Sequence, residues 1–468
     1  AKPAFEALPA YYDVFRRGVA TAVKLYREKN IPRETEAAKL CQSYQKISGA
    51  MTVTFDGQEQ TLARMGRVQE ETDRARREEA WKAVAARRLA DREKLEEIFD
   101  GLLGLRGEIA QEAGFSETRA YFFEARERFD YTPDDCLRFH DAIEKQIVPL
   151  VREMQAERKA KLKVETLRPW DLAVDPAARP PLKPFATGDE LFQKTDAIFG
   201  EVDPRLKGYF EILDKGGLVD LENRKGKAPG GYQANLPEAR VPFIFMNAVG
   251  MQRDVETLLH EAGHAFHTLA AREQGLASYR NGIPIEFCEV ASMSMELLGA
   301  PYLEKFYSPE EAKRARRDHL EGIVKFFPWM AIVDGFQHWL YTHPGHSRAE
   351  RKAAWLALMD RFGGIEDWSG LGDLEEARAY LWHRQLHIFE YPFYYVEYGI
   401  AQLGALQVWS KAQENRKGAI DAYLRGLALG GSKPLPQLFE GAGIAFDFTE
   451  KTIAPLIAKV REEMGKLS

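Results

Sequence analysis

The nine-residue segment LLHEAGHAF, at positions 258–266, constrains this chain more than any other part of the sequence. His260 and His264 stand four residues apart, so on a helix their side chains project from one face. Two imidazoles at this spacing can bind one zinc ion, with metal–nitrogen distances of about 2.0–2.1 Å. Glu261 would then lie beside the metal and could accept a proton from a metal-bound water. The alternative is a core helix whose histidines only form hydrogen bonds.

A catalytic zinc site has three protein ligands and one open position, so a third ligand is needed. Metzincin proteases place a glycine three residues after the second histidine and another histidine three residues later. This chain has His267 and Ala270 at those positions, which excludes that class. On a helix His267 lies about 10 Å along the axis from His260, so the two cannot share a metal. We expect His267 to be a neighbour of the site or a buried core histidine.

The segment PIEFCEVASMSMELL, at positions 284–298, has apolar residues at helical spacing and three carboxylates among them. Glu286 follows the proline that begins the predicted helix, where the helix dipole favours an acid. A carboxylate in an apolar stretch is costly unless it is paired or binds a metal. The spacing alone does not choose the third ligand among Glu286, Glu289 and Glu296.

The strings HEAGHAFH and FCEVASMSMEL together resemble the thimet oligopeptidase and oligoendopeptidase F family of zinc metallopeptidases, and oligoendopeptidase F more closely. The resemblance runs from about residue 60 to near the C-terminus. It implies that one zinc ion is held by His260, His264 and Glu289. It also implies that Glu261 is the general base.

The stretch HIFEYPFYYVEYG, residues 387–399, also resembles oligoendopeptidase F. Water attack on a peptide carbonyl creates a negative oxygen, to which a phenol or an imidazole can donate a hydrogen bond. The resemblance assigns this role to His387 and Tyr398. The alternating tyrosines of the family are interrupted here by a valine and by an extra residue after the histidine. We include Tyr395 as the second phenol, with Tyr394 and Tyr391 as alternatives. The simpler interpretation is an aromatic helix face buried in the core.

Residues 220–250 resemble the segment that precedes the zinc helix in oligoendopeptidase F. The run VPFIFMN, at positions 241–247, is typical of a β-strand. Glycine pairs nearby predict turns around residues 218–223 and 232–236. An extended peptide substrate could add to such a sheet as a further strand. The alternative is that the glycines only shape hairpins.

Helices are predicted for most of the remaining chain. Residues 61–113 carry charges of both signs, have apolar residues at helical spacing and contain no proline. Residues 133–163 begin with Pro-Asp-Asp, which suits a first helical turn. The proline-rich stretch 165–187 predicts an extended connection. The sequence therefore predicts a mainly α-helical fold.

The resemblance implies a more detailed architecture. It has two helical lobes around a deep substrate channel, with a small β region beside the zinc helix. We expect an N-terminal helical part, residues 1–100, followed by a catalytic zinc peptidase domain, residues 101–468. The chain begins at Ala1 and is shorter than members of the family usually are, so we expect that an upstream segment is absent from it.

Composition excludes several other classes of protein. The chain has 468 residues, 45% of them hydrophobic, and a net charge of -6. It has no basic patch of the kind that binds nucleic acid. No apolar run approaches the 18 residues or so of a membrane span, and the N-terminus lacks the apolar core of a secretory signal. The three cysteines are widely spread, which favours a reducing cytoplasm over a disulfide framework.

We therefore expect a cytoplasmic zinc metalloendopeptidase that hydrolyses internal bonds of short oligopeptides, with no nucleic-acid or membrane partner. One alternative is a helical zinc carboxypeptidase, which needs a basic residue to bind the terminal carboxylate; Arg280 and Arg384 are candidates. Another alternative is a non-catalytic peptide-binding protein. The presence of Glu261 argues against it, because a protein that only binds peptides needs no general base.

Overall fold

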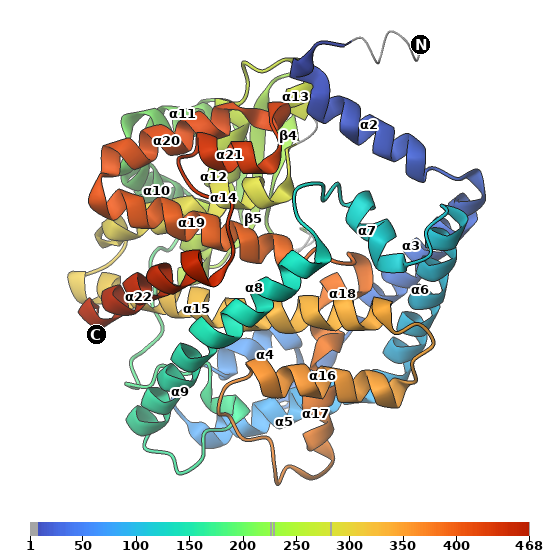
Figure 1. Ribbon diagram of the computed structural model, residues 1–468. Helices are drawn as coiled ribbons and strands as arrows, with labels where there is room; N and C mark the ends of the chain where they lie inside the picture. The colour runs from blue at the N-terminus through green and yellow to red at the C-terminus, as the bar shows by residue number, and fades with distance from the viewer. Residues whose placement is uncertain (1–7, 225–226, 228–229, 281–282, 468) are drawn as a thin grey trace. The chain divides into compact units, whose positions relative to one another are not determined.

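A computed structural model describes residues 8–467 apart from 225–226, 228–229 and 281–282 (Figure 1). Helices make up most of the described chain, and the strands form one two-stranded and one three-stranded sheet. The predicted mainly α-helical fold is confirmed. None of the helices in these ranges is both long enough and apolar enough to cross a lipid bilayer.

The chain forms two compact units, each assembled from separate segments of sequence. The first unit contains residues 1–21, 182–323 and 397–468, and the second contains residues 22–181 and 324–396. The predicted domain boundary at residue 100 falls inside a helix of the second unit, α6 (Arg92–Glu112). The assignment of catalysis to residues 101–468 stays a prediction, as does the substrate channel.

The first unit holds the segment LLHEAGHAF, residues 258–266. Its helices and strands are α10 (Gly188–Val202), α11 (Pro204–Lys215), β3 (Val219–Glu222), β4 (Tyr232–Leu236), β5 (Val241–Ala248), α12 (Gln252–Ala270), α13 (Leu276–Arg280), α14 (Ile285–Gly299), α19 (Val396–Glu414), α20 (Arg416–Ala428), α21 (Leu435–Gly441) and α22 (Glu450–Lys466). Two further helices, α2 (Asp13–Leu25) and α15 (Pro309–Thr342), begin in this unit and continue into the second.

The predicted β region is confirmed as a three-stranded sheet in the order β3-β5-β4. β3 is parallel to β5, and β4 is antiparallel to it. Burial alternates along β5, which turns Ile244 and Met246 into the core, and α12 packs against β5 and β4. Because β5 lies in the middle, β4 has one edge that no strand in the described part of the chain covers.

The connection from β5 to α12 is set by local interactions. Gly250 has a φ of 88°, a left-handed conformation that glycine adopts without steric cost. The Asp254 carboxylate accepts hydrogen bonds from the backbone N–H groups of Val249 and Met251, at 2.8 and 2.9 Å. These bonds satisfy donors at the start of α12 and place an acid where the helix dipole favours it.

Gly263 allows α12 to approach α14 closely. A Cβ atom at this position would lie 2.5 Å from Cα of Ser292 and 2.6 Å from the backbone oxygen of Ala291. No side chain fits at those distances, since both neighbours are backbone atoms of α14. The glycine within the HEAGH string therefore brings α14 against the face of α12 that carries the histidines.

The second unit is also mainly helical. Its elements are α3 (Ile31–Gly49), β1 (Thr52–Phe55), β2 (Gln58–Thr61), α4 (Leu62–Val68), α5 (Arg74–Ala90), α6 (Arg92–Glu112), α7 (Thr118–Ala125), α8 (Pro133–Gln146), α9 (Val148–Leu162), α16 (Arg348–Phe362), α17 (Glu376–Ala379), α18 (Leu386–Glu390) and the part of α15 from Val324 onward. The helical predictions for residues 61–113 and 133–163 are confirmed, with breaks at residues 69–73, 91 and 147.

Candidate metal centre

Helices α12 and α14 bring three predicted metal ligands together. The Nε2 atom of His260 lies 3.2 Å from Oε2 of Glu289, and Nε2 of His264 lies 3.8 Å from the same oxygen. One donor atom from each of the three residues falls within 4.8 Å of the other two. Ligands at about 2.0–2.1 Å from a tetrahedral zinc are roughly 3.4 Å apart, so these donors are spaced as zinc requires.

The other two carboxylates of α14 have different surroundings. Glu296 lies on the opposite side of His260, with Oε1 2.6 Å from Nδ1 of His260 and Oε2 2.8 Å from Nε2 of His319. Glu286 is buried at the start of the helix and is not part of the donor group. A carboxylate only accepts hydrogen bonds, so His260 carries a proton on Nδ1, which leaves Nε2 as the nitrogen that could bind a metal.

Electrostatics around His260 follow from these contacts. Burial opposes charge on the ring, yet the carboxylates of Glu289 and Glu296, which accept hydrogen bonds from it, hold the pKa of His260 well above its usual value. Burial also disfavours the charged form of Glu296, but hydrogen bonds with His260 and His319 lower its pKa to about 2. The pKa of Glu289 is likewise lowered, against burial, by His264 and His260. The site therefore presents ionised carboxylates, which suits a cation.

Glu261 lies on α12 between the two histidines, and its side chain is buried, with 7% exposed. Burial raises the pKa of this carboxyl to about 7, with the negative charge of Glu289 adding to the effect. The backbone of Gln233 in β4 forms a hydrogen bond with it. Glu261 thus lies between the sheet and the three donors and is not itself one of them.

His267 is a buried core residue. Its ring packs edge-on against Phe287, with centroids 5.6 Å apart, and burial lowers its pKa to about 3. Within the described part of the chain, its Nε2 atom has no hydrogen-bond partner. Of the two expectations for His267, the structure supports the buried core histidine.

His387 belongs to the second unit, on the short helix α18. Burial and the charge of Arg126 lower its pKa to about 4, so the ring is neutral at pH 7. The side chain of Gln385 lies 2.8 Å from Nδ1 of His387, and the indole N–H of Trp329 donates to Oε1 of Gln385 at 3.0 Å. Because Oε1 accepts from Trp329, the amide NH₂ of Gln385 faces the imidazole and donates to Nδ1. The proton of His387 is then on Nε2, where it can be donated.

The aromatic residues after His387 form a turn between two helices, which is contrary to the interpretation of one aromatic helix face. Phe393 has a φ of 60°, and α19 begins only at Val396. The Tyr395 ring lies 5.0 Å from the His387 ring by centroids, and Tyr394 stacks on it at 5.7 Å. Tyr391 is 41% exposed. These tyrosines lie around His387, which their closeness to it in the sequence had indicated.

Tyr398 lies in the first unit, on the first turn of α19. Its neighbour Glu397 is buried. Burial raises the pKa of Cys288, the residue before Glu289, and the charges of Glu289, Glu286 and Glu397 add to the effect. Gly404 lies farther along α19. A Cβ atom at this position would be 2.6 Å from Cγ2 of Val290. Helix α19 therefore packs against the part of α14 that carries Glu289. The predicted oxyanion donors thus come from both units, Tyr398 from the first and His387 with Tyr395 from the second.

The sequence does not reveal contacts among side chains that are far apart in the chain. Glu296 was considered only as a possible metal ligand, and nothing in the pattern linked it to His319 on α15. Gln385 and Trp329 were not identified either. The only signal for Gln385 was its position two residues before His387, which does not reveal an amide anchored by a distant indole.

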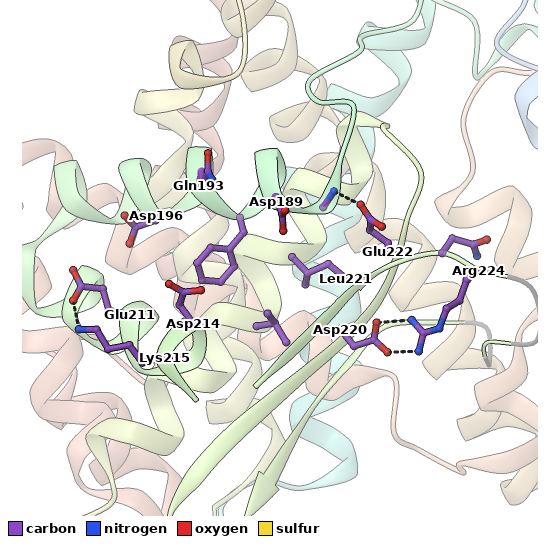
Figure 2. Close-up of a pocket in the computed structure, with 14 residues that line it drawn as sticks. Asp189, Gln193, Asp196, Glu211, Asp214, Lys215, Asp220, Leu221, Glu222 and Arg224 are labelled. Carbon is purple, nitrogen blue, oxygen red and sulfur yellow. Dashed lines mark hydrogen bonds and ion pairs between the residues drawn. The ribbon is translucent and has the colours of Figure 1, made fainter. Parts of the chain in front are cut away.

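A cavity of about 810 Å³ between α10, α11 and β3 is separate from these residues (Figure 2). Its lining includes six carboxylates, from Asp189, Asp196, Glu211, Asp214, Asp220 and Glu222. Three of the six form ion pairs. Asp196 contacts Lys207, Glu211 contacts Lys215, and Asp220 contacts Arg224 and Lys227, all at 2.6–2.9 Å. None of the predicted site residues lines this cavity.

The sequence of this chain is similar to the sequences of two oligopeptidases. An oligoendopeptidase F homolog of Borreliella burgdorferi is 25% identical over 303 residues, covering 62% of this chain and 49% of the relative. Oligopeptidase PepF of Bacillus subtilis is 26% identical over 321 residues, covering 68% of this chain and 46% of the relative. The chain therefore spans about half the length of these relatives.

A solved structure shares the fold over nearly the whole chain. The structure of PZ peptidase A with an inhibitor superposes with a TM-score of 0.89 and 30% sequence identity, covering 97% of this chain and 80% of that one. The family described as peptidase family M3 matches residues 67–456, which is most of the sequence. This chain belongs to peptidase family M3.

Proposed function

We propose that this chain is a zinc-dependent endopeptidase that hydrolyses internal bonds of oligopeptides. The observation that carries the proposal is the convergence of His260, His264 and Glu289 beside a buried Glu261 that is not one of the three donors. Membership of peptidase family M3 supports it. A site with three protein ligands leaves the fourth position of a tetrahedral ion open, as a catalytic site requires.

His260 and His264 would hold the zinc through their Nε2 atoms, and Glu289 through a carboxylate oxygen. A bound zinc ion supplies Lewis acidity, which polarises the substrate carbonyl and makes water more acidic. Glu296 fixes the tautomer of His260, because it accepts the Nδ1 proton at 2.6 Å. Ser292 donates to Oε2 of Glu289 at 3.1 Å and helps to orient that carboxylate.

Glu261 would act as the general base. It follows His260 directly on α12, so its carboxylate is close to the donors without competing for the ion. It would take the proton from the attacking water and deliver it to the leaving amine. Its burial limits hydration of the carboxylate, which favours transfer of the proton over its loss to solvent.

Neutral donors would stabilise the oxyanion. His387 would donate from Nε2, where Gln385 directs its proton, and Tyr398 and Tyr395 would supply phenolic hydroxyls. Neutral hydrogen-bond donors stabilise developing charge without requiring a fixed charge to be buried. The peptide itself would add along the uncovered edge of β4, whose Gln233 already contacts Glu261.

An internally quenched peptide of about ten residues tests the proposal, with wild type compared against Glu261→Gln at equal measured zinc content. We expect internal cleavage by the wild type and a loss of at least about a hundredfold in kcat for the variant. Chelation of the metal should abolish cleavage by the wild type. If both proteins bind zinc and neither cuts the peptide, the protein is a peptide binder instead.

A C-terminally amidated copy of the same peptide separates an endopeptidase from a carboxypeptidase. An endopeptidase cleaves both peptides equally, whereas a carboxypeptidase loses activity on the amide. Of the basic residues considered for carboxylate binding, Arg384 stacks over Trp329, 4.9 Å from its ring centroid. The side chain of Arg280 lies outside the described part of the chain. The cytoplasmic location and the absence of nucleic-acid and membrane partners stay predictions.

A further inference from the structure

A second group of metal-binding side chains lies in the second unit, between α8 and α15. Cys136 and His140 stand four residues apart on α8, and Asp334 and His338 stand four residues apart on α15. This spacing puts each pair on one face of its helix. None of the four residues is more than 4% exposed. The two faces meet, since Nε2 of His140 lies 2.9 Å from Oδ2 of Asp334.

The donor atoms converge in the same way as those of the first site. One donor atom each from Cys136, Asp334 and His338 lies within 4.8 Å of the other two. Nε2 of His338 is 3.3 Å from Oδ2 of Asp334, close to the separation of about 3.4 Å between two ligands of a tetrahedral zinc. In the described part of the chain, this is the one other group of donors with such spacing.

Two of these donors lack hydrogen bonds. Nε2 of His338 and Oδ1 of Asp334 are buried and have no hydrogen-bond partner among the described residues. Buried polar atoms are nearly always satisfied, so two unsatisfied atoms in one cluster point to a missing ligand. A cation would satisfy both atoms at once, because a carboxylate oxygen and an imidazole nitrogen each offer it a lone pair.

We propose that Cys136, Asp334 and His338 bind a divalent transition metal of the zinc class, at a site distinct from the proposed catalytic centre. A thiolate, an imidazole and a carboxylate together form a ligand set that zinc prefers. The Cys136 thiol loses its proton to the buffer as the Sγ–metal bond forms. Thiolate and carboxylate then balance the two positive charges, so the buried site is neutral. His140 donates to Asp334 and orients its carboxylate, as partners of metal ligands do.

This metal would join α8 to α15 beneath the turn that follows His387. The His338 ring lies 5.1 Å from the Phe393 ring by centroids. The preceding residue, Gln337, accepts a hydrogen bond from the backbone N–H of Phe393 at 2.9 Å. Phe393 is the residue with positive φ in that turn. All three ligands are buried, with no more than 4% of any of them exposed.

A substitution of Arg119 can distinguish a metal site from a network that is held together by hydrogen bonds alone. Its guanidinium lies 3.5 Å from Nδ1 of His338. When Nε2 binds a metal, the proton of His338 must be on Nδ1, so this guanidinium has to withdraw. Arg119→Gln removes the positive charge and provides an amide oxygen that can accept the Nδ1 proton. We therefore expect Arg119→Gln to strengthen metal binding at this site, whereas loss of Cys136 should weaken it.

Cobalt provides the test, because the proposed catalytic centre has no thiolate ligand. The full chain is produced in cobalt-supplemented medium, so that the ion is present while the buried site folds. We expect about two metal ions per chain and a thiolate-to-cobalt absorption band in the near ultraviolet. Cys136→Ser should remove the band and one ion. Cys288→Ser, a matched control next to Glu289, should keep the band.

A further variant with His260→Ala and His264→Ala separates this proposal from the proposed function. It should retain one cobalt ion and the full band while losing the first site. Wild-type protein that is folded by circular dichroism, contains one ion and shows no near-ultraviolet band would overturn the second site. A band that persists in Cys136→Ser would overturn it equally. Arg119→Gln should lower the chelator-competition Kd severalfold, and a weaker site in that variant would contradict the ligand geometry.

Discussion

Glu296 accepts a hydrogen bond from a candidate metal ligand on one oxygen and from His319 on the other. Replacing it by glutamine removes the negative charge that stabilises the Nδ1 proton of His260. We expect Glu296→Gln to weaken zinc binding by about 10–100-fold, the range typical for partners of metal ligands. Competition with a chromogenic chelator measures this change directly.

His319→Gln is the graded control for that prediction. A glutamine amide can still donate to Glu296, so zinc binding should weaken less than in Glu296→Gln. If the two variants lose affinity equally, or if neither loses any, Glu296 does not act by orienting His260. The readout is metal affinity, so it is independent of whether peptide is cleaved.

Gln385 sets the proton position of His387 in the second unit. Gln385→Glu replaces the amide donor by a carboxylate, which accepts and draws the proton to Nδ1. The added charge should also raise the pKa of His387 from about 4 toward or above the ordinary value of about 6.5. Nitrogen-15 NMR of the ring resolves both the tautomer and the titration.

The His387 ring makes the free energy of unfolding depend on pH. With the wild-type residue, the folded pKa of His387 lies below the unfolded value, so this ring favours the folded state most above about pH 6.5. That contribution falls as the pH drops from about 6.5 to about 4. In Gln385→Glu, this loss of stability at acid pH should become smaller or change sign. An unchanged nitrogen-15 titration in the variant would show that Gln385 does not donate to Nδ1.

At the scale of secondary-structure elements, the metal centre depends on the close approach of α12 and α14. Gly263→Ala places a methyl group against backbone atoms of Ser292 and Ala291. Since backbone cannot rotate away, α14 must shift and carry Glu289 with it. We expect a loss of roughly 1–3 kcal/mol in the free energy of unfolding from overpacking, together with weaker zinc binding. Urea denaturation and metal titration measure the two effects.

Gly322→Ala is the matched control within the same unit. Gly322 lies inside α15, and a Cβ atom there meets nothing within 4 Å. Alanine has a higher helix propensity than glycine by about 1 kcal/mol, so this substitution should be neutral or stabilising. Zinc affinity should not change. Equal destabilisation by both substitutions would mean that the helix contact at Gly263 is not the cause.

For the molecule as a whole, buried ion pairs make stability depend on pH. Asp171 is fully buried in the second unit, where it accepts hydrogen bonds from Arg74 at 2.8 and 2.9 Å and from Arg77 at 3.0 Å. Burial opposes its charge, yet these bonds hold its pKa below the usual value. Its contribution to stability is therefore complete above the unfolded pKa of about 3.9 and is lost as the pH falls through the folded pKa.

Asp171→Asn should lower the free energy of unfolding at pH 7 by about 3–5 kcal/mol, because Arg77 is left buried without its charged partner. The difference from wild type should shrink at acid pH. Asp56→Asn, at the exposed ion pair with Arg76, is the control, and we expect no measurable change there. A pH-independent difference for Asp171→Asn would show that charge is not what the arginines bind.

Short-range sequence patterns predicted much of the fold. Apolar periodicity and proline positions located the helices within 61–113 and 133–163, and β-branched and aromatic runs located β5. The hairpin of β1 and β2 was missed, although Asp56-Gly57 between Phe55 and Gln58 is a strong turn signal. Its strands are only four residues long, so their pattern is too short to stand out beside the helices.

The sequence by itself determined what lies within one helix: the spacing of His260 and His264, the position of Glu261, and the glycine between them. These features repeat with the helical period and need no tertiary information. Tertiary structure alone decided which carboxylate faces Nε2 of His260 and which faces Nδ1, because Glu289 and Glu296 lie on another helix two turns apart. It also decided that Cys136 meets Asp334, about two hundred positions along the chain. Such pairings arise from the packing of helices, and helix packing depends on the whole core, which no local pattern contains.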